Sequence, residues 1–321
     1  MKTQQAGVRV EKLIDALVRK TAPVCAVLAL CQVPCLAHVE HEEAQPPLAP
    51  ESEGTGASRS SLQSRVSISV EGDFRLIRAN GLPDHATGAF PNRGNPNRIR
   101  AQEYAFRVPA NPKPAEKPMP LGMNPFGVAV NGVVFDPGAA EWWRDDRASG
   151  WQYEALSGAR ELGVDANHAH VQPDGAYHYH GLPTGLIEKL TGGKPQVILL
   201  GWAADGFPIY GPWGYSAPDD TNSPIVRLKS SYRLKPGERA GGPGGKHDGS
   251  FVADYEFVKG AGHLDECNGR FGVTPEFPQG TYYYVLTDNF PFIPRMLKGS
   301  PDASFLRRQL APRPRPPRRP R

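Results

Sequence analysis

Short stretches of alternating apolar and polar residues, separated by turn-forming residues, recur along this chain. Residues 64–70 place Val66, Ile68 and Val70 on one face, which is the period of a β-strand. Residues 126–135 alternate around an Asn-Gly pair that is typical of a type I′ hairpin turn. Further strands are predicted at residues 74–77, 101–108, 197–200 and 281–287, and short helical turns at residues 139–157 and 186–191.

Residues 167–180 are predicted to form a second hairpin. Pro173 presets φ for the first turn position, Asp174 can hydrogen-bond to its own backbone, and Gly175 tolerates a positive φ. Together they predict a type I turn followed by a left-handed glycine, which is a three-residue hairpin loop with a G1 bulge. This loop fixes which residues of the two strands face each other.

Four of the nine histidines lie in this hairpin, at His168, His170, His178 and His180. The register places His170 opposite His178 and His168 opposite His180. Residues two apart share one face of a strand, so all four imidazoles are predicted on the same face. Protonated rings this close would repel, and a divalent metal resolves this because neutral imidazole is its commonest ligand. Catalysis without a metal and a structural hydrogen-bonded cluster stay open as alternatives.

Composition favours turns over long helices. The chain has 321 residues, with 35 Gly and 34 Pro, and its hydrophobic content of 39% is ordinary for a globular protein. We therefore predict a mainly β fold, an irregular β-sandwich-like domain with long Gly/Pro-rich loops and few short helices.

The N-terminus has the organisation of an export signal. A basic pair at residues 19–20 precedes an apolar run that ends near Ala37, and this run is too short to span a membrane. We expect a periplasmic or secreted protein without an integral membrane segment in its mature chain. The predicted organisation is a signal peptide (1–37), a disordered linker (38–64), a small N-terminal β segment (65–110), a main domain (120–300) and a disordered Arg/Pro-rich tail (307–321).

The formal net charge of +4 comes from the two ends of the chain. The predicted signal carries +3 and the tail from Arg307 carries +7, so the remainder carries −6. This mildly acidic body argues against nucleic acid as a partner.

Cysteine usage follows from the same division. Cys25, Cys31 and Cys35 lie in the predicted signal, so only Cys267 remains in the mature chain and no internal disulfide is expected. A single thiol of this kind is buried and inert, a soft metal ligand, or a partner for another chain, and we favour a buried one.

Four spaced motifs resemble the YHYH-domain family of secreted bacterial proteins. They are Asp-Gly-Ala-Tyr-His-Tyr-His-Gly at 174–181, Ala-Asp-Gly-Phe-Pro-Ile-Tyr-Gly at 204–211, the segment 264–276, and the segment 280–295. The resemblance covers about residues 120–300 and implies an exported, β-rich domain. Family members often carry Tyr-His-Tyr where this chain has Tyr282-Tyr283-Tyr284, so a histidine ligand from that strand is absent.

Two functions from different classes follow. The first is a metal-binding protein with His168, His170, His178 and His180 as ligands, copper ranking before zinc, and Asp205 or Asp265 orienting the rings. The second is a hydrolase acting on an extracellular polymer, with a hairpin histidine as general base and Asp205 or Glu266 as its partner. A surface module held together by its histidines is a third.

Overall fold

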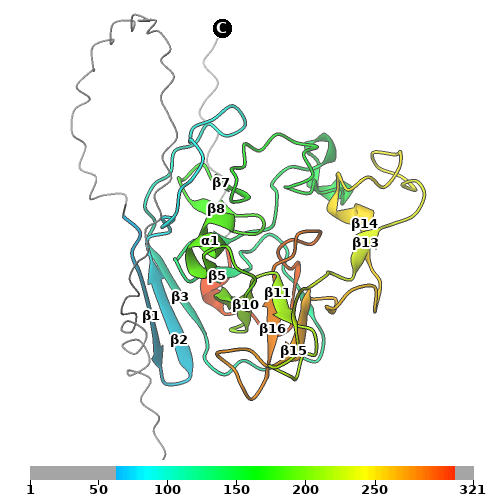
Figure 1. Cartoon of the computed structure of the whole chain (residues 1–321). Helices are drawn as coiled ribbons and strands as arrows, with labels where there is room; N and C mark the ends of the chain where they lie inside the picture. Colours follow the sequence, from blue (N-terminus) through cyan, green and yellow to red (C-terminus); the bar gives the residue numbers. More distant parts are fainter. Residues whose placement is uncertain (1–62, 308–321) are drawn as a thin grey trace, which may run out of the picture. The chain divides into compact units, whose positions relative to one another are not determined.

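The protein was examined in a computed structural model that describes residues 63–307 (Figure 1). Strands dominate this part of the chain, so the predicted mainly β fold is confirmed. Its one α-helix is α1 (Thr184–Thr191), where a helical turn was expected at residues 186–191. None of the helices in residues 63–307 is long and apolar enough to span a membrane.

Some sequence predictions fall outside the described residues. The predicted signal, nearly all of the linker, and the tail beyond Arg307 belong to this group, together with Cys25, Cys31 and Cys35. The predictions made for these segments therefore stay predictions.

The centre of the fold is an eight-stranded sheet with the order β15-β16-β10-β9-β5-β6-β8-β7. Neighbouring strands run antiparallel except for two parallel pairs, β6 with β8 and β10 with β16. The parallel β6–β8 pair joins the two predicted hairpins into one sheet. The strands are β5 (Gly127–Ala129), β6 (Val134–Phe135), β7 (Ala169–Val171), β8 (Tyr177–Tyr179), β9 (Leu199–Ala203), β10 (Pro208–Tyr210), β15 (Gly269–Gly272) and β16 (Thr281–Val285).

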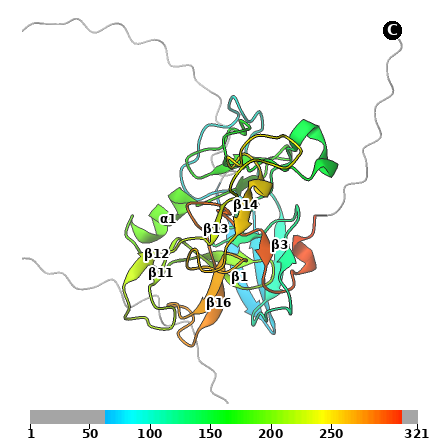
Figure 2. The ribbon, with the colours of Figure 1, turned by 90° about the vertical axis from the view of Figure 1, so that its right-hand side faces the viewer.

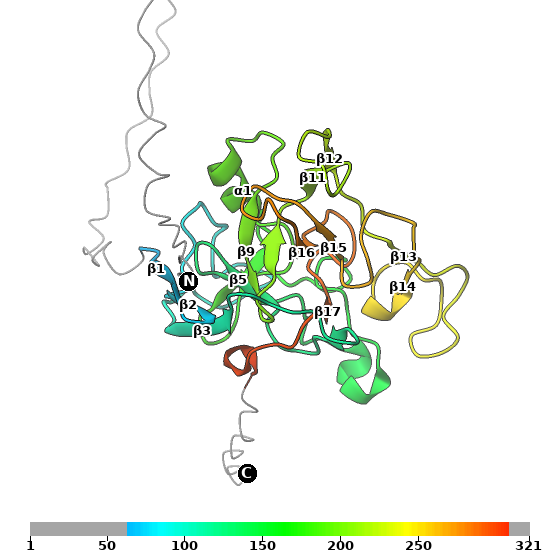
Figure 3. The ribbon, with the colours of Figure 1, turned by 90° about the horizontal axis from the view of Figure 1, so that it is seen from below.

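A smaller antiparallel sheet is built from β1 (Val66–Glu71), β2 (Phe74–Ala79) and β3 (Tyr104–Pro109), which overlap the strands predicted at residues 64–70, 74–77 and 101–108. Ile77 and Phe106 of this sheet are buried in the same core as Phe135 of the central sheet. The two sheets thus contribute side chains to one apolar core, as expected for a sandwich-like domain. Figure 3 shows β1–β3 beside the central sheet.

Short elements surround these sheets. The β13–β14 hairpin and the β1–β3 sheet lie on opposite sides of the central sheet in Figures 1 and 3. The 3-10 helix η6 (Ala303–Phe305) contacts β3, as Figure 2 shows. The remaining elements are β4 (Met119–Pro120), β11 (Trp213–Tyr215), β12 (Ile225–Arg227), β13 (Tyr232–Leu234), β14 (Tyr255–Phe257), β17 (Met296–Leu297), η3 (Trp143–Asp145), η4 (Arg147–Ser149) and η5 (Val252–Asp254).

The turn between β5 and β6 differs from the prediction. A type I′ turn requires a positive φ at both central residues, yet only Gly132 of the Asn131-Gly132 pair has one, at 81°. The N–H of Gly132 donates to Ala129 O at 2.8 Å, so the turn ends on the left-handed glycine instead. The Asn131 side chain is buried at this turn and donates to the Tyr179 hydroxyl at 3.0 Å.

Candidate metal centre

The hairpin of β7 and β8 has the predicted register. His170 pairs with His178, and the N–H of Gln172 donates to Ala176 O at 2.9 Å. The turn closes through a 2.8 Å bond from Gly175 N–H to Gln172 O, with Gly175 at φ 94°. The Pro-Asp-Gly turn therefore places His170 opposite His178 through residues that are close in the sequence.

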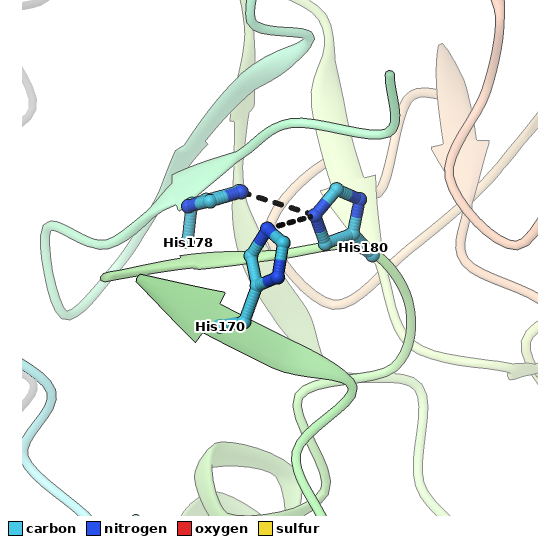
Figure 4. A group of neighbouring side chains, drawn as sticks. All are labelled: His170, His178 and His180. Atoms are coloured by element: carbon cyan, nitrogen blue, oxygen red, sulfur yellow. Dashed lines mark hydrogen bonds between the residues drawn. The ribbon is translucent and has the colours of Figure 1, made fainter. Parts of the chain in front are cut away.

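Three histidine rings converge on one point (Figure 4). The Nε2 atoms of His178 and His180 are 3.0 Å apart, and those of His180 and His170 are 3.1 Å apart. Each pair of ring centroids is separated by 4.7 Å, with interplanar angles of 65–82°. In residues 63–307 this is the only group of three or more side chains that meets the geometry of a metal-ligand cluster.

The outer nitrogens of two rings are already engaged. His170 Nδ1 contacts Leu162 O at 2.8 Å, and His178 Nδ1 contacts Ala176 O at 3.1 Å. A carbonyl oxygen can only accept, so each Nδ1 carries the proton and each Nε2 presents its lone pair to the centre. The buried Nδ1 of His180 has no partner at hydrogen-bond geometry.

Burial keeps the three rings neutral. Desolvation, followed by the charge of His170, lowers the pKa of His178 to about 3. Desolvation lowers the pKa of His180 well below its usual value, and lowers that of His170 against the opposing effect of the Leu162 carbonyl. Neutral imidazole is the form that binds a metal, so the environment prepares the rings for ligation.

The nitrogen separations suit a small divalent ion. A metal–nitrogen bond of about 2.0–2.1 Å implies about 3.3–3.4 Å between two donors of a tetrahedral site. The separations of 3.0 and 3.1 Å are within a few tenths of this value. Three converging donors leave further coordination positions free for a ligand from solvent.

The cluster forms one wall of a pocket with a volume of about 330 Å³. The thioether of Met123, the carboxylate of Glu141 and the guanidinium of Arg307 belong to residues that line the same pocket. An ion held by the histidines would therefore be accessible to a small molecule.

His168 does not join this group, which corrects the expectation of four converging rings. Its φ is 51°, so the strand alternation fails one residue before β7 begins at Ala169. Its Nδ1 contacts Leu182 O at 2.9 Å instead. The register opposite His180 still holds for the backbone, since His180 N–H donates to His168 O at 2.7 Å.

The structure places Asp205 and Asp265 with the tyrosines of β16. Asp205 Oδ2 accepts from the Tyr284 hydroxyl at 2.6 Å, and Asp265 Oδ1 accepts from the Tyr282 hydroxyl at 2.9 Å. Neither carboxylate hydrogen-bonds to a histidine, so no contact supports the predicted role of Asp205 or Asp265 in orienting the rings. The nearby Cys267 is buried, as favoured, and burial raises the pKa of its thiol to about 12.

Asp136 is the acidic residue that the sequence analysis missed. It follows β6, and its N–H donates to Tyr179 O at 2.9 Å, between His178 and His180 along β8. Its carboxylate is buried, and Oδ2 accepts at 3.0 Å from Gln172, which directly follows β7. Desolvation raises the pKa of Asp136 to about 6, with Arg307 opposing. No local sequence signal marks it, because the parallel pairing of β6 with β8 brings it here.

Comparison with known proteins supports the family suggested by the motifs. A family model described as YHYH protein matches residues 105–299. No curated protein and no solved structure matches the chain.

Proposed function

The chain belongs to the YHYH protein family, and we propose that it is an exported metal-binding protein whose ion is held by His170, His178 and His180. One observation carries this proposal: His180 Nε2 lies 3.0 Å from His178 Nε2 and 3.1 Å from His170 Nε2, with two of the three rings buried and His170 half-buried. With two of the Nδ1 atoms bonded to carbonyls, the Nε2 lone pairs oppose each other unless a proton or a cation lies between them. His168 is left out of the proposed ligand set because its ring bonds to Leu182.

Copper ranks first among the candidate ions and zinc second. Imidazole donors suit both, and Cu²⁺ stands highest in the general affinity order of divalent first-row metals. Met123 lines the pocket beside the histidines, and a thioether is a soft donor that favours Cu(I). Zinc fits the short nitrogen separations equally well.

The open pocket supports a second candidate, a metal-dependent hydrolase. An ion with three protein ligands and an accessible position can act as a Lewis acid or lower the pKa of bound water. Glu141 lines the same pocket and supplies a carboxylate for proton transfer. An extracellular polymer as its substrate stays a prediction from the sequence.

Export is the remaining part of the proposal. It is supported by the apolar run before Ala37 and the basic pair before it. A periplasmic or secreted location would also expose the site to the metals outside the cytoplasm.

The test is to express the full chain in a bacterial host without an affinity tag. The metal content is measured by plasma mass spectrometry, and the N-terminus by protein sequencing. About one equivalent of copper or zinc, with a mature N-terminus near His38, supports the proposal. A protein that takes up neither ion after reconstitution would contradict it, and an N-terminus at Met1 would contradict export.

A further inference from the structure

Arg307 is held beside the histidine pocket by the segment that precedes it. Phe305 of η6 is buried and stacks on Phe106 of β3 with ring centroids 4.3 Å apart. The N–H of Arg307 then donates to Asn124 Oδ1 at 3.0 Å. The guanidinium therefore starts from an anchored backbone.

One edge of this guanidinium pairs with a buried carboxylate. Arg307 contacts Asp136 Oδ2, and the Asp136 side chain is only 2% exposed whereas that of Arg307 is 40% exposed. Across residues 63–307 this is the one ion pair or hydrogen bond that the Arg307 side chain makes. A guanidinium has five N–H donors in a planar fork, so most of them remain available toward solvent.

Arg307 and the histidine cluster line the same pocket. Arg307, His170, His178 and His180 all line the cavity of about 330 Å³. The neutral imidazoles would leave the charge of a bound divalent ion uncompensated, and Arg307 adds a positive charge at the same cavity. Asp136 compensates the charge of Arg307, and Glu141 is the one acidic side chain that lines the cavity, so a bound divalent ion still leaves an excess of positive charge.

We propose that this pocket binds a small carboxylate ligand, whose carboxylate pairs with Arg307 while a second polar group reaches the ion. A carboxylate matches the planar fork of a guanidinium in two parallel hydrogen bonds. The ion pair with Asp136 orients the fork and prevents it from turning away. This inference rests on the proposed metal centre and names the class of molecule that the centre receives.

The experiment uses three probes of nearly equal shape: succinate, its monoamide succinamate, and neutral succinamide. Their affinities for the metal-loaded full chain are measured by titration calorimetry, with the metal counted in every sample before and after. We expect affinity to fall in the order succinate, succinamate, succinamide. Arg307→Gln is expected to weaken succinate binding about tenfold or more and to reduce the difference between the probes.

Two further variants control the test. Arg233→Gln removes an exposed arginine that pairs with Glu256, outside the pocket, and succinate affinity is expected to stay unchanged. Asp136→Asn combined with Arg307→Gln avoids leaving a buried carboxylate unpaired, so it tests the loss of binding if the single variant folds poorly.

The metal count separates two kinds of failure. Equal succinate affinity in the wild type and the Arg307 variants, at full metal content, overturns the carboxylate inference and leaves the metal centre in place. A wild-type chain without bound metal overturns the proposed function, and the inference with it.

Discussion

The eight-stranded sheet carries two clusters of polar side chains, the tyrosines of β16 and the histidines of the β7–β8 hairpin. The two clusters differ in how their polar atoms are hydrogen-bonded. In the tyrosine cluster of β16, formed by Tyr282 and Tyr284, both hydroxyls donate to carboxylates, Tyr284 to Asp205 at 2.6 Å and Tyr282 to Asp265 at 2.9 Å. The Lys298 N–H also donates to the Tyr284 hydroxyl at 2.6 Å. This cluster is complete without any external molecule.

The histidine cluster is completed differently. The inner nitrogens of His170, His178 and His180 face only one another, and the cluster opens on a pocket. Buried polar groups are normally satisfied by the protein or by a bound molecule. Burial of polar side chains alone therefore does not mark a ligand-binding site. Metal-donor atoms that are directed at a common point beside a pocket do mark one.

Removal of two metal ligands is expected to have the largest effect. We expect His178→Ala with His180→Ala to reduce the bound metal from about one equivalent to none while the fold persists. Four-ligand zinc sites are worth about 10–16 kcal/mol, so the loss of two of three ligands removes more than about 5 kcal/mol. Plasma mass spectrometry measures the metal and circular dichroism measures the fold. His247→Ala, whose ring contacts Gly237 O, is the matched control and should keep its metal.

The tyrosine cluster should respond in stability and not in metal content. Asp205→Ala leaves the Tyr284 hydroxyl and the Gly299 N–H without their acceptor. We expect a loss of about 3 kcal/mol in the free energy of unfolding, since each buried unsatisfied group costs about 1–3 kcal/mol. Urea unfolding measures this, with exposed Asp219→Ala as the control. Loss of metal in the Asp205 variant would contradict this prediction and would show that Asp205 contributes to metal binding.

The stability of the metal-free protein is expected to depend on pH through the buried ring of His178. The pKa of His178 falls from an ordinary 6.5 to about 3 on folding, so between these values the unfolded chain binds a proton that the folded chain does not. Stability is therefore complete above about pH 6.5 and falls as the pH is lowered. Each such histidine contributes a slope of about 1.4 kcal/mol per pH unit. Unfolding at pH 6 and pH 5 should show a correspondingly smaller slope in His178→Gln, and an unchanged slope would contradict the burial of a neutral ring.

The smallest expected effect concerns the histidine outside the cluster. His168→Ala removes the bond to Leu182 O, and we expect a loss of stability of about 1 kcal/mol with the metal content unchanged. Thermal unfolding and metal analysis on the same samples separate the two readouts. A variant without metal would restore the four-ligand site expected from the sequence.

What could be predicted from the sequence was local. The Pro173–Gly175 turn sets the register of His170 with His178 through neighbouring residues, and the structure confirms it. His168 lies in a turn that is closed by a 3.0 Å hydrogen bond from its N–H to Asp165 O, and its φ is positive. The alternation of residues in the strand does not predict this turn. Alternation fixes a face only as long as the backbone stays extended.

The parts that could not be predicted depend on distant pairings. Asp136 reaches the histidine face because β6 runs parallel to β8, and Arg307 arrives there from the far end of the described chain. The buried carboxylates beside Tyr282 and Tyr284 likewise come from other segments. Spacing along the chain carries no information about such contacts.

The ion pair between Asp136 and Arg307 joins residues 171 positions apart, whereas the cross-strand pair His170–His178 closes within eight residues. Short loops close early in folding and long-range contacts close late. The histidine hairpin can therefore form before Arg307 pairs with Asp136 while the chain folds. We expect the metal ligands to come together before Arg307 reaches Asp136. An ion can then bind to the histidines before the positive charge of Arg307 is in place.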